Sequence, residues 1–184
     1  MKKHESLAAL RAAFPHTVPV LAGYAVLGMA FGILMRTEGY GLLITGLMSS
    51  LVFAGSLQYV ALTLLTAAFN PVQALLLTLL VNARHLFYGL AMIDRYKDTG
   101  AVKPYLIFGL TDETFSITCS TDAPPGVERS RFLFFITLLN HCYWVLGSLA
   151  GVLVGGVLSF NTQGLDFVLT ALFVVILVNQ WQVR

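Results

Sequence analysis

The sequence has few charged residues and almost no cysteine. Of its 184 residues, 57% are hydrophobic and only 11% are charged, whereas a soluble domain usually carries about 25% charged residues. Most side chains must therefore face lipid or other buried helices. The formal net charge of +2 is too small to suggest a nucleic-acid partner. Cys119 and Cys142 have no CxxC spacing and are interpreted as ordinary residues of membrane helices.

Several motifs of known chemistry are absent. The chain has no HExxH, GxSxG or Walker A motif and no short internal repeat. An ATP-driven pump or a standard hydrolase therefore has no support, and we expect neither enzymatic activity nor a cofactor. The N-terminal stretch MKKHESLAALRAAFPHT is basic but lacks a convincing signal-peptide cleavage site. We therefore expect a retained first helix with a cytoplasmic N-terminus, supported by Lys2, Lys3 and Arg11.

Long hydrophobic runs are what the sequence has in excess. They predict an all-α, polytopic integral membrane protein with about five to six membrane segments, forming a single transmembrane domain over residues 1–184. At the start of one segment, Asn70 can cap a helix and Pro71 fits its first position. The segments are expected at about 17–35, 41–68, 71–93, 104–118, 131–158 and 166–184.

Two of these segments are interrupted at their centres, which affects the predicted topology. If every segment crossed the membrane, the basic loop 94–103 would lie on the side opposite the N-terminus. If segments 41–68 and 104–118 instead enter and return, both that loop and loop 119–131 lie on the N-terminal side, and only Arg36 lies outside. Basic residues prefer the cytoplasmic side, so we favour the re-entrant arrangement.

The segment LLVNARHLFYGL, residues 79–90, places polar side chains within an apolar run. An arginine at the centre of a bilayer costs about 2.5–3.5 kcal/mol on insertion scales. Arg84 should therefore face protein or a water-filled cavity, in contact with a polar or acidic partner from segment 41–68 or 104–118. Asn82 and His85 share one helical face, and Arg84 lies on the neighbouring face. The structural alternative is an ion pair from Arg84 to Asp112 or Glu113 that only holds helices together.

The segment GLTDETF, residues 109–115, contains two adjacent carboxylates. Gly109 loosens the backbone, and Thr111 or Asp112 can cap a new helix with Asp112 and Glu113 in its first turn. Adjacent carboxylates in a low dielectric repel each other, so one could hold a proton near neutral pH. We therefore predict proton coupling through Asp112, Glu113 and His85. The alternative is plain capping at the membrane surface.

The segment AGSLQY, residues 54–59, combines small residues with a carboxamide. A half-helix beginning at Ser56 would direct free N–H groups at an anion such as a substrate carboxylate. Gln58 offers both donor and acceptor groups. The alternative is tight helix packing with Gln58 bonded to a neighbour.

Two further features concern packing. The small residues Gly147, Gly151 and Gly155, and likewise Gly28 and Gly32, recur at the spacing of helix-packing surfaces. His141 could serve as a proton relay or a metal ligand, although a structural histidine with satisfied hydrogen bonds is the favoured interpretation.

Five segments together resemble the AzlC-like family of branched-chain amino acid permeases: FAGSLQYVAL, LLVNARHLFYGL, FGLTDETFS, WVLGSLAG and GLDFVLTALFVVILV. The resemblance runs from about residue 15 to the end, and the NARH and TDE elements are its specific part. It implies the large subunit of a two-component exporter of leucine, isoleucine and valine in the inner (plasma) membrane. The implied partner is a small AzlD-like membrane subunit. Family members usually continue with further hydrophobic sequence, so the resemblance also implies a C-terminal truncation as one interpretation.

A carrier for a zwitterion needs a partner for each charge and an apolar slot. We expect Arg84 or the helix start at Ser56 to hold the carboxylate, and Asp112 or Glu113 to hold the ammonium or the coupling proton. Apolar pockets separate aliphatic chains by only about 1–3 kcal/mol per methylene, so we expect overlap among leucine, isoleucine, valine and methionine. The predicted substrate-binding residues are Arg84, Ser56, Gln58, Asn82 and Phe87, and the predicted slot residues are Phe53, Leu57, Phe87 and Phe115.

The resemblance implies export of branched-chain amino acids, and the adjacent carboxylates suggest that it runs by proton antiport. Two rival classes are kept. One is an intramembrane enzyme with a metal bound by His85, His141, Asp112 and Glu113. The other is a membrane channel or scaffold subunit.

Overall fold

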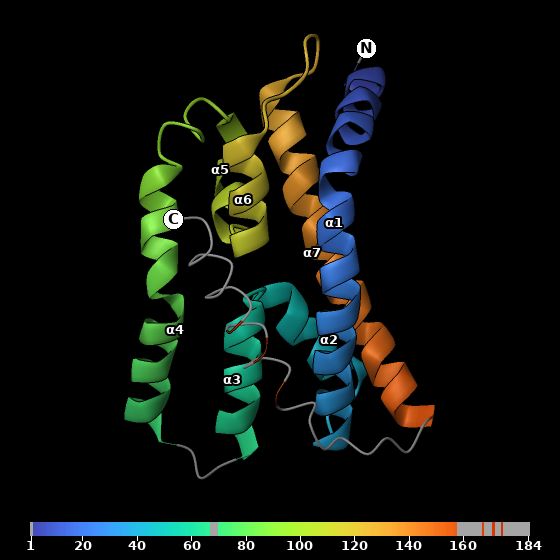
Figure 1. The fold of residues 1–184 in the computed structure, drawn as a ribbon, viewed down its shortest axis with the longest axis vertical. Coiled ribbons are helices and arrows are strands. Elements are labelled where there is room, and N and C mark those ends of the chain that lie inside the picture. The colour runs from blue at the N-terminus through green and yellow to red at the C-terminus, as the bar shows by residue number, and fades with distance from the viewer. Residues whose placement is uncertain (1, 67–69, 158–166, 168–170, 172–173, 175–184) are drawn as a thin grey trace.

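All regular structure in the described residues is helical (Figure 1). The computed structural model describes residues 2–66 and 70–157, together with 167, 171 and 174. The all-α prediction is confirmed for these residues, and the predicted segment 166–184 otherwise lies outside them. The helices are α1 (Lys2–Thr37), α2 (Leu42–Leu51), α3 (Gly55–Thr66), α4 (Pro71–Ala91), the 3-10 turn η1 (Gly100–Val102), α5 (Lys103–Phe108), α6 (Asp112–Ser120) and α7 (Arg129–Val157).

Three of the described helices, α1, α4 and α7, are long and apolar enough to cross a membrane. The 21 residues of α4 extend for about 31 Å, close to the thickness of a bilayer's hydrocarbon core. The other two predicted segments of the described chain are each divided into two short helices. None of these four is longer than the 12 residues of α3.

The first helix is longer than predicted. It begins at Lys2 instead of near residue 17. The reason is packing: Ala9 and Ala13 are fully buried, and Glu5 accepts a hydrogen bond from Arg131 of α7 at 2.8 Å. The basic N-terminal residues therefore continue the helix along α7.

Glycine brings α1 and α7 into backbone contact. A Cβ atom at Gly32 would lie 2.0 Å from the carbonyl oxygen of Ser148, and one at Gly151 would lie 2.1 Å from that of Met29. Any larger residue would force the helices apart. The predicted glycine packing surface is therefore confirmed.

The two interrupted segments form hairpins that point in opposite directions (Figure 1). α2 runs from the far end of α1 into the middle of the molecule, and α3 returns toward that same end. α5 and α6 do the same from the opposite end. The first break contains Phe53, whose φ of +37° lies in the left-handed region. At the second break, Thr111 caps α6 by accepting the backbone N–H of Thr114 at 3.3 Å.

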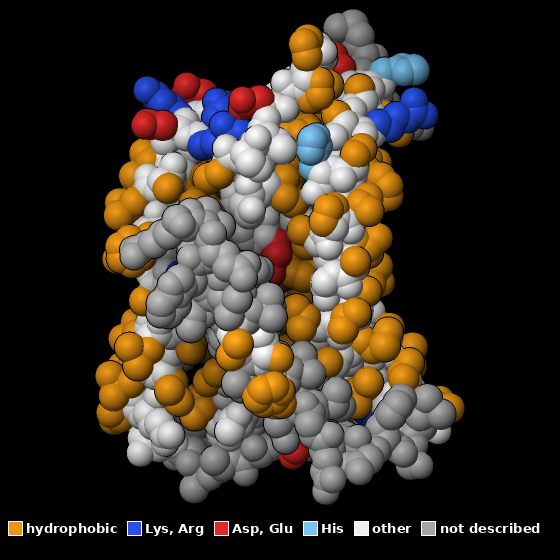
Figure 2. All heavy atoms as spheres, in the orientation of Figure 1, with side chains coloured by type: hydrophobic (Ala, Val, Ile, Leu, Met, Phe, Trp, Pro, Cys, Tyr) orange, Lys and Arg blue, Asp and Glu red, His pale blue; other side chains and the backbone are white. Residues whose placement is uncertain are grey.

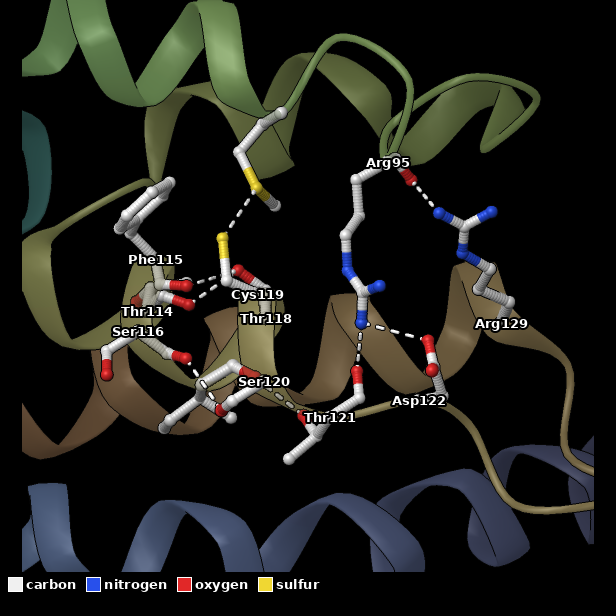
Figure 3. A network of polar contacts seen from close by, with 12 residues as sticks. Arg95, Thr114, Phe115, Ser116, Thr118, Cys119, Ser120, Thr121, Asp122 and Arg129 are labelled. Carbon is white, nitrogen blue, oxygen red and sulfur yellow. Dashed lines mark hydrogen bonds and ion pairs between the residues drawn. The ribbon is translucent and has the colours of Figure 1, made fainter.

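Hydrogen bonds join the basic loops at one end of the molecule (Figure 3). Arg95, after α4, donates to the carbonyl of Thr121 and pairs with Asp122 at 3.0 Å. Arg129, at the start of α7, donates to the carbonyl of Arg95 at 2.5 Å. With the Glu5–Arg131 contact, these bonds place both loops and the N-terminus together. This is the arrangement that the re-entrant topology predicts. Figure 2 shows charged side chains gathered at this end and apolar side chains covering the flanks.

We predict that Gly32→Ala destabilises the protein, because its methyl group would overlap the backbone of α7. The free energy of unfolding should fall by about 1–3 kcal/mol, the usual cost of overpacking. The measurement is thermal unfolding in detergent, followed by circular dichroism. Gly23→Ala is the matched control, since a Cβ there meets nothing within 4 Å. Equal unfolding temperatures for the two variants would contradict the close α1–α7 contact.

Candidate functional site

The two hairpin breaks meet midway along the molecule, beside α4. The ring of Phe53, in the first break, and the ring of Phe108, at the end of α5 next to the second break, have centroids 6.3 Å apart. Both α3 and α6 begin here. The first backbone N–H groups of a helix have no partner within that helix and carry a partial positive charge. The site is therefore bounded by two helix N-termini.

Arg84 connects α4 to both of these helix starts. Its Nη1 donates to Oδ2 of Asp112, and its Nη2 donates to the hydroxyl of Ser56. The predicted contact with a polar or acidic partner from segment 41–68 or 104–118 is therefore confirmed, and Arg84 makes such a contact with both. The side chains of Arg84 and Asp112 are each 27% exposed. One guanidinium thus ties together three segments that are distant in the sequence.

The local sequence fixes the start of α4 as predicted. The Asn70 side chain accepts backbone hydrogen bonds from Val72 at 3.0 Å and from Gln73 at 3.2 Å, and Pro71 occupies the first turn. Arg84 lies nearly four helical turns further on, at the level of the two breaks.

The adjacent carboxylates Asp112 and Glu113 face different partners, because successive residues of a helix do not share a face. The hydroxyl of Tyr24, in α1, donates to Oε2 of Glu113 at 2.6 Å. It also lies 2.9 Å from the hydroxyl of Thr111. Glu113 is therefore held toward α1, and Asp112 toward α4.

A small cavity lies between these groups. Its polar lining comes from Ser56, Arg84, His85, Thr111, Asp112 and Glu113. Its apolar and aromatic lining comes from Tyr24, Leu27, Phe53, Ala54, Gly55, Tyr59 and Trp144. In Figure 2, acidic atoms are visible in a hollow midway along the molecule.

The cavity volume is about 40 Å³. This is room for a few water molecules, against the roughly 300–1,000 Å³ of typical small-molecule sites. A ligand as large as an amino acid therefore requires the walls to move apart.

Three predicted substrate-binding residues lie away from the cavity lining. Gln58 is fully buried; its Oε1 accepts the indole N–H of Trp144 at 2.8 Å, and its amide donates to Ser49 at 3.4 Å. It therefore follows the packing alternative and links α3, α7 and α2. Phe87 is 67% exposed on the outer face of α4. Asn82 is half-buried, and its Oδ1 has no hydrogen-bond partner among the described residues.

Of the four predicted slot residues, only Phe53 lines the cavity. Phe115 instead stacks on Tyr88, with ring centroids 4.4 Å apart. The aromatic wall comes from Tyr24 and Trp144, which the sequence reasoning did not propose as lining. One signal was present: Tyr24 lies one turn before Gly28, on the face that packs against α7.

The two candidate histidines, His85 and His141, are in separate environments. His85 lines the cavity, and its Nδ1 has no partner in the described part of the chain. His141 lies 3.0 Å from the hydroxyl of Tyr105 through Nδ1, and its ring lies 4.3 Å from that of Phe53. Within residues 2–66 and 70–157, no three His, Cys, Asp or Glu side chains are placed to hold a metal ion. The four residues named for a metal site, His85, His141, Asp112 and Glu113, therefore form no such group there.

Comparisons with known proteins agree on one family. The model of the AzlC protein family matches residues 19–158. The branched-chain amino acid transport protein AzlC of Bacillus subtilis is 52% identical over 98% of this chain and 71% of that protein. An uncharacterized membrane protein of Helicobacter pylori strain 26695 is 46% identical over 97% of this chain and 78% of its own length. The inner membrane protein YgaZ of Escherichia coli is 26% identical over 90% of this chain and 71% of its own length.

No solved structure matches the chain. The relatives named as membrane proteins, together with three helices long enough to cross a bilayer, identify the chain as a membrane protein.

A double-mutant cycle tests the Arg84–Asp112 ion pair. Arg84→Met and Asp112→Asn each leave a half-buried polar group unpaired, so each should lower the free energy of unfolding by about 1–3 kcal/mol. The free energy of unfolding of the double variant should fall by less than the sum of the two single losses, with a coupling energy of about 1–2 kcal/mol. Chemical unfolding in mild detergent measures all four proteins. The more exposed Glu5–Arg131 pair is the control and should couple by less than about 1 kcal/mol. Additive losses at Arg84 and Asp112 would show that the pair contributes nothing.

Proposed function

Because the chain belongs to the AzlC protein family, we propose that it transports branched-chain amino acids across the inner membrane of the cell. The observation that carries the proposal is the 52% identity, over 98% of the chain, to a protein named for this transport. The cavity chemistry supports it, because a guanidinium, carboxylates and an aromatic wall suit a zwitterion with an apolar side chain.

The substrate carboxylate binds at Arg84 and at the start of α3. The Nε–H of Arg84 has no partner among the described residues, which leaves a donor for an incoming carboxylate. Ser56 and the first N–H groups of α3 add further donors. The substrate ammonium lies toward Asp112 or Glu113, and its aliphatic side chain toward Leu27 and Phe53. Leucine, isoleucine, valine and methionine are the expected substrates.

Transport requires the two hairpins to change position, since the cavity is too small for an amino acid. Broken helices that meet at the middle of the bilayer are the usual form of a transporter site. In this proposal α1, α4 and α7 cross the membrane, while α2–α3 and α5–α6 enter and return. With the segment at 166–184, this gives the five to six membrane segments that the sequence suggests, within one domain.

The end that contains the N-terminus is assigned to the cytoplasm. Arg11, Lys97, Lys103 and Arg131 belong to this end, whereas Arg36 belongs to the other, and basic residues favour the cytoplasmic side. The direction is export and the driving force is proton antiport, with Asp112, Glu113 and His85 as the proton-carrying candidates. The partner is a small AzlD-like membrane subunit, which the family resemblance implies.

Counterflow of radiolabelled leucine into proteoliposomes tests the transport proposal. The intact protein, with or without its small partner subunit, should concentrate labelled leucine when the vesicles contain unlabelled leucine. Arg84→Met should reduce this counterflow by at least about tenfold, the usual loss of about 1.4 kcal/mol or more of binding energy. Arg11→Gln, at an exposed position, is the matched control. If Arg84→Met lowered the amount of protein but left the flux per molecule unchanged, a scaffold would be the better description.

Cysteine labelling in whole cells tests the topology. In a background with Cys119 and Cys142 replaced by serine, a cysteine at Asp98 should resist a membrane-impermeant reagent added outside. A cysteine at Glu38 should react with it. Both positions are exposed, so accessibility depends on the side of the membrane. Labelling at Asp98 from outside would contradict the cytoplasmic assignment and the re-entrant topology with it.

A further inference from the structure

The two adjacent carboxylates of the cavity differ in their counter-charges. Asp112 is paired with Arg84. Glu113 accepts a hydrogen bond from Tyr24, a neutral donor, and makes no ion pair among the described residues. Protonating Asp112 would weaken the contact that ties α4 to α6, whereas protonating Glu113 would leave that contact intact.

The charges around Glu113 can be listed by element. The titratable or charged side chains that line the cavity with Glu113 are Tyr24 from α1, Tyr59 from α3, Arg84 and His85 from α4, and Asp112 from α6; among the described residues α7 contributes Trp144. Tyr88 of α4, outside the lining, also interacts with Asp112 and Glu113 and is neutral. With both carboxylates ionised and His85 neutral, one negative charge remains uncompensated. In a site of low dielectric, such a charge strongly favours the uptake of one cation.

We infer that Glu113 binds either a proton or the ammonium group of the substrate, one at a time, and that this exchange couples the two fluxes. The inference rests on the proposed transport function and identifies the site of coupling within it. A protonated Glu113 has no charge for an ammonium, and an ammonium on Glu113 leaves no place for the proton. Asp112 has a separate role, which is to hold Arg84 toward the substrate carboxylate.

Single occupancy of Glu113 determines the charge that moves. A zwitterionic amino acid leaves without net charge, and one proton returns in its place. Each cycle therefore carries one positive charge inward. An interior-negative membrane potential should drive export, and so should a pH gradient.

The test is the affinity of the intact protein for leucine as a function of pH, by equilibrium binding in detergent or nanodiscs. For the natural protein, the leucine Kd should rise by about tenfold for each unit of acidification below a midpoint, because one proton is released per leucine bound. Glu113→Gln should bind leucine more weakly, with a Kd that does not depend on pH. Glu38→Gln, an exposed carboxylate near the other end of α1, should behave as the natural protein.

Tyr24→Phe provides a second variant that keeps the carboxylate. Loss of the hydroxyl donor disfavours the ionised form of Glu113, so the midpoint of the affinity curve should move to higher pH while its slope is retained. Tyr24 acts here as a positioning residue, and a purely structural role would lower stability without moving the midpoint. His85→Gln should retain the pH-dependent slope.

Three results would overturn the inference. One is a leucine Kd of the natural protein that is flat between about pH 5 and 8, and a second is an unchanged slope in Glu113→Gln. The third is a slope that disappears in His85→Gln instead. In each of these cases leucine still binds, so the proposed function stands. If the natural protein neither binds nor exchanges leucine, the proposed function and the inference both fail.

Discussion

The interaction on which the site depends is the contact of one guanidinium with two helix starts. Arg84 lies in the middle of a helix that is apolar on most of its surface, where a cation is costly without partners. Ser56 and Asp112 supply those partners. Both can reach Arg84 only if α3 and α6 begin halfway along the molecule. This requirement explains why segments 41–68 and 104–118 are interrupted. Because of the interruptions, each segment forms a hairpin that returns to the end of the molecule from which it started.

The same contact explains how α4 is attached. No residue of α4 is buried, and large apolar side chains such as Leu79 and Leu80 are mostly exposed. Apolar packing therefore contributes little to holding this helix in its place within the described part of the chain. Surrounded by lipid, such a face gains nothing from water exclusion, and polar contacts and close fit become the forces that orient the helix. Arg84 supplies the polar contact.

Much of this arrangement could be predicted from the sequence, because its signals are local. The cap at Asn70, the helix start at Thr111, the break near Ser56 and the glycine packing surface each depend on a few neighbouring residues. The contact of Arg84 with polar partners was predictable for another reason. An unpaired cation within the membrane is costly, so its side chain must find such partners. The family resemblance was confirmed by the comparisons, although it concerns the whole chain instead of particular contacts.

Side-chain direction could not be predicted in the same way. Phe87 and Gln58 lie close to Arg84 and Ser56 in the sequence, yet one faces outward and the other bonds to Trp144. Which way they point depends on how α3 and α4 are rotated against their neighbours. Tyr24 was not found because its partner, Glu113, is 89 residues away.

The backbone contact between α1 and α7 has a mechanical consequence. At Gly32, an added methyl group would lie 2.0 Å from a carbonyl oxygen of α7. No side chain separates the two helices at this point, so none can rearrange to let them slide past each other. We therefore expect α1 and α7 to behave as one rigid unit. Tyr24 and Trp144 belong to that unit, whereas Ser56, Arg84 and Asp112 belong to the neighbouring helices. We therefore expect widening of the cavity to move Arg84 and Asp112 away from the aromatic wall, while Tyr24 and Trp144 keep their places.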